Sequence, residues 1–236
     1  MAREQTGTPD ASGDEALRRE CLRLYRRYAV EIVEAFGFCP YAERCRLEGG
    51  TREVVLTTPE LDLELALETA EALARDERVE IGLVLWPRVR TGRRGLSTFV
   101  EAVRAAHQRR PGGLVMAMEG FHPDAEADLG APERLVPFVR RTPDPTIQLV
   151  RHAVLERVRR GSPQGTAFFD PRTMPLEDLE TPSRPLHERI AEANLATVRR
   201  EGVAGVEERL LDIFRDRDRT YAALGERRSS TRPPNA

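Results

Sequence analysis

The feature that most constrains the fold is an alternation of hydrophobic periods between residues 53 and 121. Three short runs rich in valine and leucine predict β-strands, at 53–57, 79–86 and 114–121. Two longer segments carry apolar residues at helical spacing and predict helices between these strands, at 59–75 and 96–109. Strand–helix–strand units of this length favour right-handed crossovers between parallel strands. The sequence therefore predicts an α/β fold with a small, mostly parallel sheet of three or four strands.

Further helices are predicted on both sides of this alternation. Apolar residues recur at helical steps over residues 15–36, and Gly37 is a typical stop signal. Asp144 and Pro145 predict the start of another helix that continues to about Arg160, because Asp is a favoured N-cap and Pro a favoured first residue. A helical C-terminal extension is predicted at 185–200 and 205–224. These helices would pack on the faces of the sheet.

The chain length suits one domain with short tails. Residues 1–13 and 225–236 are polar or proline-rich and are predicted to be disordered tails, with a single α/β domain over 14–224. A proline- and acid-rich connection at 123–143 is longer than an ordinary loop, which is typical of functional or lid-like segments. Residues 161–184 are predicted to form an irregular linker.

Composition excludes several classes of protein. The formal net charge is -2, from 37 basic and 39 acidic residues, so no overall field favours nucleic acid or a membrane. All basic residues are arginine, which codon bias in a GC-rich genome explains, so arginine-rich patches carry little weight by themselves. Three cysteines without close pairing argue against a disulfide framework or a four-cysteine zinc site. No apolar run approaches the ~20 residues that span a bilayer. We expect a soluble, cytoplasmic protein.

Cys39 is the first candidate for chemistry. It lies just after the predicted end of the long helix and just before Pro40, at a boundary between elements. A helix C-terminus raises the pKa of a thiol, so a reactive Cys39 needs a partner from elsewhere in the chain. The alternative is a thiol that only packs at a helix end.

His122 is the best candidate for that partner. The three predicted strands each leave through an X-Pro step, and in a parallel sheet these steps share one edge, where ligands of open α/β sheets bind. Trp86 and His122 stand at two of these steps. His122 is therefore either a general base or a histidine that hydrogen-bonds to the loop after it.

Arg141 and Thr142 precede the predicted helix start at Asp144, where free N–H groups suit an anion. A phosphate or carboxylate could be held there by Arg141 through a forked contact, and Arg151 lies beside the apolar stripe of the same helix. The alternative is that Asp144 caps the helix and the arginines pair with acids nearby.

Four short motifs occur in order along the chain: Phe-Cys-Pro-Tyr-Ala at 38–42, Phe-His-Pro-Asp at 121–124, Arg-Thr-Pro-Asp-Pro at 141–145 followed by Leu-Val-Arg at 149–151, and a helical motif at 190–200. Together they resemble a bacterial family known as domain of unknown function 1415, over roughly residues 25–202. The resemblance implies no known activity. It marks the positions of Cys39, His122, Arg141, Arg151 and Asn194.

This chain departs from the family pattern after the second strand. Trp86 stands where the family commonly has a histidine before a proline, so no histidine is assigned there. The connection after His122 also lacks the usual aromatic and asparagine residues. Asn194 is unusual on its own account, because asparagine is a poor residue for a helix interior. We interpret Asn194 as a buried, structural hydrogen-bonding residue.

These residues favour a Cys/His-dependent enzyme acting on a small phosphorylated or carboxylated molecule. Cys39 would be the nucleophile or redox thiol and His122 its base. Arg141, Thr142, Arg151, Tyr41 and Trp86 would bind the substrate. One alternative is a metal- or haem-binding module without turnover, using Cys39, Cys45 and His122. The other is a structural or partner-binding protein. No cofactor, metal or oligomeric state is assigned.

Overall fold

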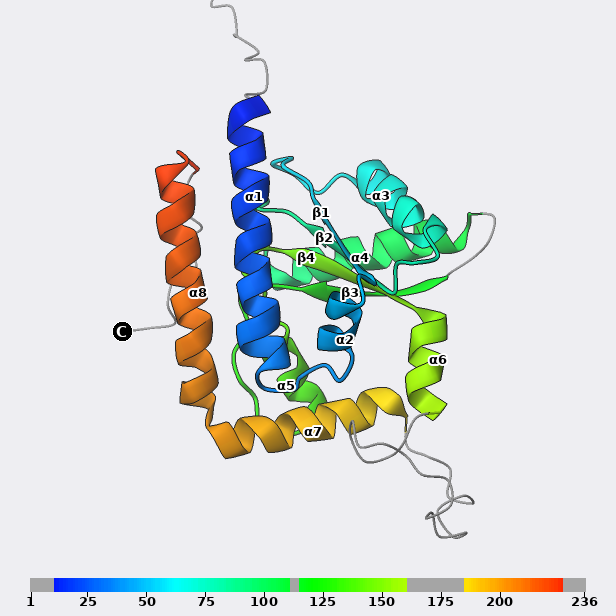
Figure 1. The fold of residues 1–236 in the computed structure, drawn as a ribbon, viewed down its shortest axis with the longest axis vertical. Coiled ribbons are helices and arrows are strands. Elements are labelled where there is room, and N and C mark those ends of the chain that lie inside the picture. Colours follow the sequence, from blue (N-terminus) through cyan, green and yellow to red (C-terminus); the bar gives the residue numbers. More distant parts are fainter. Residues whose placement is uncertain (1–10, 111–114, 161–184, 227–236) are drawn as a thin grey trace, which may run out of the picture.

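The computed structural model describes residues 11–110, 115–160 and 185–226. Its centre is a four-stranded sheet in the order β1-β2-β4-β3 (Figure 1). The strands are β1 (Thr51–Val55), β2 (Ile81–Leu85), β3 (Met116–Phe121) and β4 (Thr146–Arg151). β1 pairs with β2 in parallel, whereas β4 lies antiparallel between β2 and β3. The α/β class is confirmed, but the prediction of a mostly parallel sheet is wrong.

Strand β4 is the source of that error. The sequence predicts a helix from Asp144, but the chain forms β4 there, and helix α6 (His152–Arg160) begins only afterwards. The carbonyl oxygen of Pro145 accepts a hydrogen bond from the Trp86 N–H at 3.0 Å, and β4 then pairs with strands on both sides. Sheet pairing on both edges outweighs a local N-cap signal, because propensity is a weak prior against tertiary contacts.

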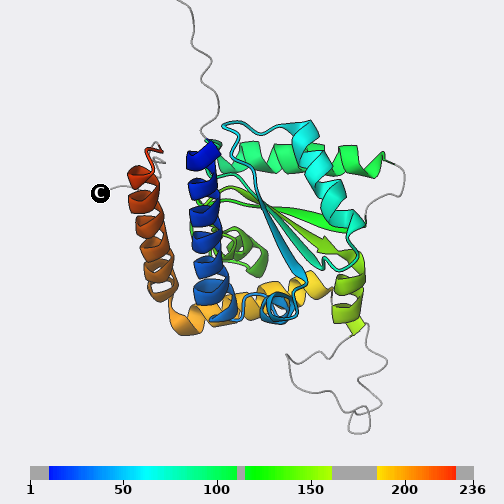
Figure 2. The ribbon, with the colours of Figure 1, turned by 45° about the horizontal axis from the view of Figure 1, so that its top comes forward.

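Two helices cover one face of the sheet, α3 (Leu63–Arg75) and α4 (Arg93–Gln108). Figure 2 shows both on the side of the sheet away from α1. Their packing is close at β3, where a Cβ atom on Gly120 would lie 3.2 Å from the side chain of Val100. The core of this layer consists of buried side chains from alternate strand positions, among them Val84, Trp86, Met116, Met118, Ile147 and Leu149.

The other face is covered by more helices. These are α1 (Ala11–Tyr28), the π-helical segment η1 (Ala29–Glu34), α2 (Ala42–Leu47), α5 (Pro132–Val139), α7 (Leu186–Glu201) and α8 (Val203–Ala223). α1 and α8 lie side by side, and α7 runs across their lower ends (Figure 1). Their core includes Tyr28, Ile32, Leu83, Phe138 and Val198, all at most 1 % exposed.

Several predicted boundaries can now be compared with the structure. The helix predicted over residues 15–36 is confirmed as α1 and η1, and Gly37 follows it with φ of +65°. α1 begins at Ala11, within the segment predicted as a tail. The connection at 123–143 contains α5. The predicted linker at 161–184 and most of both predicted tails lie outside the described residues.

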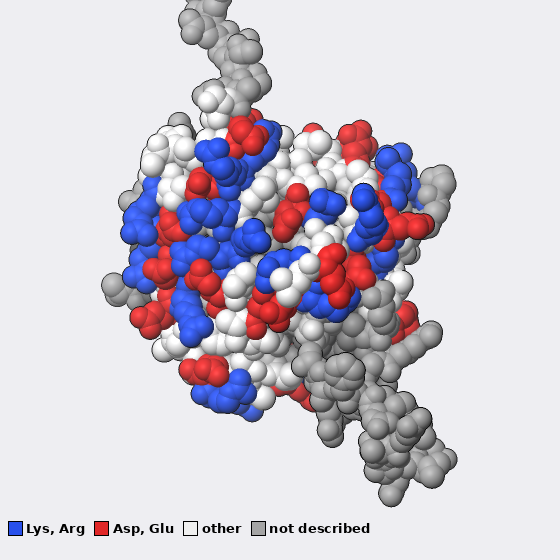
Figure 3. All heavy atoms as spheres, in the orientation of Figure 1, with Lys and Arg blue, Asp and Glu red and all other residues white. Residues whose placement is uncertain are grey.

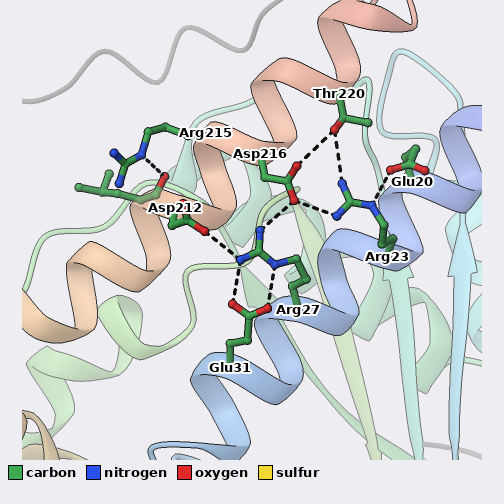
Figure 4. Close-up of polar contacts among 9 residues, drawn as sticks. Glu20, Arg23, Arg27, Glu31, Asp212, Arg215, Asp216 and Thr220 are labelled. Atoms are coloured by element: carbon green, nitrogen blue, oxygen red, sulfur yellow. Dashed lines mark hydrogen bonds and ion pairs between the residues drawn. The ribbon is translucent and has the colours of Figure 1, made fainter.

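Ion pairs join α1 to α8. Arg23 and Arg27 of α1 each contact Asp216 of α8 at 2.8 Å, and Arg27 also contacts Asp212 at 2.9 Å (Figure 4). The space-filling view shows the same alternation of basic and acidic groups over these two helices (Figure 3). None of the described helices is both long and apolar enough to cross a membrane.

Candidate functional site

A cavity of about 510 Å³ lies on the face of the sheet that α1, α5 and α7 cover. We call it the sheet cavity. Side chains from two neighbouring rows of the sheet form its floor, Thr51, Ile81, Val150 and Ala117 in one row and Glu53, Leu83, Gln148 and Glu119 in the next. They point to one face because alternate strand residues do. The cavity therefore follows directly from the strand register.

Cys39 lies on the wall of this cavity. Its position is the short turn between η1 and α2, and its side chain is partly exposed, while neighbouring Tyr41 lines the same cavity and is 8 % exposed. Burial raises the pKa of the Cys39 thiol, although backbone N–H groups of Tyr41 and Ala42 and the charge of Arg140 act to lower it. The thiol is therefore protonated at neutral pH.

Asn194 of α7 lines the sheet cavity together with Cys39 and is 6 % exposed. In the described part of the chain its amide has no hydrogen-bond partner, so the structural hydrogen bonds expected from the sequence are not seen there. The amide is not among the fully enclosed polar atoms that lack a partner, so it opens onto the space of the cavity, where a ligand could contact it.

The charged groups around the cavity are mostly carboxylates. Glu34 pairs with Arg46 at 2.7 Å, and Arg140 pairs with Glu119 at 3.1 Å while its guanidinium lies 5.2 Å from the centre of the Phe121 ring. Four lining residues are acidic and two are arginines: Glu34, Glu53, Glu119, Glu133, Arg46 and Arg140. The excess of carboxylates favours a neutral or cationic ligand over an anion.

The structure does not bring His122 to Cys39. His122 lines a different cavity, described below, while its strand neighbour Phe121 faces the sheet cavity. The His122 ring is fully hydrogen-bonded to backbone, with Nε2 at 2.8 Å from the Thr91 oxygen and Nδ1 accepting from the Asp124 N–H at 3.0 Å. Because Nδ1 accepts, Nε2 is the donor to the Thr91 carbonyl, and the two hydrogen bonds order the loop.

The arginines expected to hold an anion contact the protein itself. Arg141 is 9 % exposed, donates to the Pro123 oxygen at 3.0 Å and pairs with Glu207 at 3.2 Å. Arg151 donates to three carbonyl oxygens at the end of α3 and after it, those of Ala74, Asp76 and Val79, at 2.8–3.1 Å. Both guanidinium groups thus connect distant segments of the chain and stabilise the fold.

Thr142 and Asp144 are also internal. Thr142 is fully buried and donates to the Asp144 carbonyl oxygen at 2.7 Å. The Asp144 carboxylate is 1 % exposed and accepts from Arg217 and from Tyr221 of α8, each at 2.7 Å. Asp144 is therefore an ion-pair partner of α8 and not the helix cap that the sequence predicts.

The carboxyl ends of the strands hold structural contacts. β1, β2 and β3 do point the same way, because β2 and β3 are both antiparallel to β4. Trp86 at this edge is fully buried, with its ring centre 6.0 Å from that of Phe99. Arg88 at the same edge pairs with Asp14 and Glu226, both at 2.6 Å. Protein side chains, among them Asp14 of α1 and Glu226 after α8, thus occupy the edge at the carboxyl ends of the strands, where the topology suggested a ligand.

The residues considered for a metal do not gather either. The Cys45 thiol is buried and donates to Glu80 at 3.0 Å, and burial raises its pKa to about 12. His122 lies at the other cavity. Within the described ranges, no group of three or more His, Cys, Asp or Glu side chains is arranged to hold a metal ion.

Sequence reasoning missed most polar residues of the sheet cavity, among them Gln148 and Arg140. Gln148 stands in the apolar run of β4, and Arg140 follows the end of α5. A glutamine between Ile147 and Leu149 is the signal that could have revealed a polar position on a buried face. It was hidden because this segment was predicted to be a helix.

Residues 21–182 match the model of a family described as Protein of unknown function (DUF1415). The matched range includes the motifs around Cys39, His122 and Arg141, whereas the motif at 190–200 lies beyond it. No curated protein and no solved structure matches the chain.

Proposed function

The chain belongs to this family of unknown function, and we propose that its role is to bind a small molecule in the sheet cavity, against the Cys39 thiol. The observation that carries the proposal is the Asn194 amide, which opens onto the cavity and has no hydrogen-bond partner among the described residues. A ligand that donates or accepts a hydrogen bond there would satisfy the amide. Cavities of this size, mostly apolar with a few polar groups, are typical small-molecule sites.

The lining indicates the chemistry of the ligand. Aromatic and aliphatic side chains such as Tyr25, Phe38 and Ile190 would contact an apolar body, and Asn194 and Gln148 would bind one polar group. Because carboxylates exceed arginines around the cavity, we propose a neutral or cationic ligand for this site in place of the small anionic substrate expected from the sequence.

A fluorescence titration with N-phenyl-1-naphthylamine, a neutral apolar amine, tests this proposal. We expect saturable binding to the native protein at one site. Asn194→Leu should raise the dissociation constant about tenfold, the effect of losing one buried hydrogen bond. Gln108→Leu is the matched control, because it replaces an exposed amide on α4, away from the cavity, by the same side chain.

Two outcomes would count against small-molecule binding at this site. One is no saturable fluorescence change with native protein. The other is an equal loss of affinity in Asn194→Leu and Gln108→Leu, since this would place the probe somewhere other than the wall formed by α7.

A second candidate is thiol chemistry at Cys39, without His122 as the base. Backbone N–H groups of Tyr41 and Ala42 favour it, because they act to lower the pKa of the Cys39 thiol and such donors stabilise a thiolate. Opposing this, burial gives Cys39 a raised pKa, so we expect its alkylation by iodoacetamide to be slower at pH 7 than that of an ordinary thiol. The rate of Cys39 alkylation should keep rising above the usual thiol pKa of about 8.5. Peptide mass analysis separates Cys39 from Cys21 and Cys45.

The pH dependence of Cys39 alkylation decides whether this second candidate holds. A Cys39 rate that levels off below the ordinary thiol pKa would show an activated thiolate and would favour catalysis over simple binding. A rate that still rises at high pH leaves Cys39 as a neutral group in a binding site.

A further inference from the structure

We propose that a second cavity, beside the edge strand β3, binds the phosphate group of a small soluble ester. This goes beyond the ligand of the sheet cavity. The second cavity has a volume of about 560 Å³ and lies between the start of α4, the end of β3 and the end of α5. We call it the arginine cavity, after four of its lining residues: Arg93, Arg94, Arg104 and Arg140.

The balance of charge in the arginine cavity is positive. Its four arginines face two carboxylates, Glu101 and Glu119. Glu119 is already shared, at 3.1 Å from Arg140 and 4.0 Å from Arg104. An anion with two negative charges would neutralise the two excess positive charges of the cavity.

Arg93 and Arg94 carry most of this excess. Neither has an ion pair or hydrogen bond with any part of the chain that the structure describes. Since every basic residue of this protein is arginine, their number alone means little. Exposed arginines such as Arg19 and Arg26 also lack partners, so what sets Arg93 and Arg94 apart is that both line one cavity together with two further arginines.

The local backbone makes these two unpaired arginines unfavourable by themselves. They open α4, a helix of 16 residues whose first turn has no acidic side chain and whose N-cap, Gly92, provides no side-chain cap. The N-terminal end of a helix carries partial positive charge, so two cations there repel it. A bound anion would turn this repulsion into attraction.

Phosphate suits the arginine cavity better than a carboxylate. A guanidinium binds phosphate through two parallel hydrogen bonds, and the three terminal oxygens of a phosphate group can engage several arginines at once. Ser97 adds a hydroxyl to the lining. The volume exceeds what a bare phosphate ion needs, which leaves room for the organic part of an ester.

Titration calorimetry with pyrophosphate tests the proposal at fixed ionic strength. We expect the native protein to bind pyrophosphate at one site, and the double variant Arg93→Gln/Arg94→Gln to bind it at least tenfold more weakly. The matched control is Arg19→Gln/Arg26→Gln, which removes two exposed charges from α1 and should bind like the native protein. All four positions are exposed, so none of these changes disturbs the core.

Equal weakening in both double variants, or no binding by the native protein, would overturn the proposal. So would binding to anionic lipid vesicles but not to pyrophosphate, because a membrane surface cannot enter a cavity. Failure here is distinguishable from failure of the sheet cavity proposal, since the naphthylamine titration uses an uncharged probe and a different variant.

Discussion

Asn194 is the residue on which ligand binding depends most. Sequence alone identifies it as unusual, because asparagine is rare inside helices. Sequence does not show that its amide faces a cavity and lacks a partner, because that depends on how α7 crosses the sheet. The same limit explains Arg141 and Arg151. Their long side chains reach carbonyls of distant segments, which no local pattern reveals.

A functional amide of this kind should cost stability. We expect Asn194→Leu to raise the free energy of unfolding of the ligand-free protein by about 1 kcal/mol, because it replaces a polar side chain without a protein partner by an apolar one at a largely buried position. Urea denaturation of native protein and variant measures the difference. If the variant is instead destabilised by more than about 1 kcal/mol, the amide makes structural hydrogen bonds and the cavity loses its main polar anchor.

At the scale of elements, the helices were easier to predict than the strand order. The periodicity of α1 and the stop at Gly37 are both visible in the sequence. β4 was missed although Thr146, Ile147 and Val150 are β-branched, because Asp and Pro before it imitate a helix start. α5 was missed within its long connection, since Pro137 lies inside the helix.

The ion pairs between α1 and α8 make the stability of the fold depend on pH. Hydrogen bonds from Arg23, and then from Arg27, lower the pKa of Asp216 from 3.8 to about 2. A carboxylate whose pKa is lower in the folded state adds stability above its unfolded pKa and loses it as pH falls through the folded value. Asp216→Asn should therefore cost about 1–2 kcal/mol near neutral pH, since two partly buried pairs are lost.

The difference between native protein and Asp216→Asn should stay constant above about pH 4 and shrink towards zero as pH falls to about 2. Urea denaturation at a series of pH values measures it. Asp212→Asn is the control, because Asp212 is 57 % exposed and contacts Arg27 alone, so its loss should cost less. Equal effects of the two variants, or a difference independent of pH, would contradict this role for Asp216.

At the scale of the whole molecule, the candidate sites lie at other places around the sheet than the sequence predicts. The rule that ligands bind at the carboxyl ends of strands pointed to an edge that Trp86, Arg88 and Asp144 fill with core packing and ion pairs. The ion-pair partners of Arg88 and Asp144 lie in α1, in α8 and just after α8, far away in sequence, so local patterns could not show them. The two cavities instead lie on the sheet face and beside β3.

Protection of Cys39 tests the central claim most directly, because it reports a ligand at one named atom. The measurement is the rate of Cys39 modification by N-ethylmaleimide, with and without saturating N-phenyl-1-naphthylamine. We expect the bound probe to slow the modification in proportion to its occupancy, since Cys39 and Asn194 line one cavity. A Cys39 rate that is unchanged while the probe is bound would contradict the claim that ligands occupy the sheet cavity.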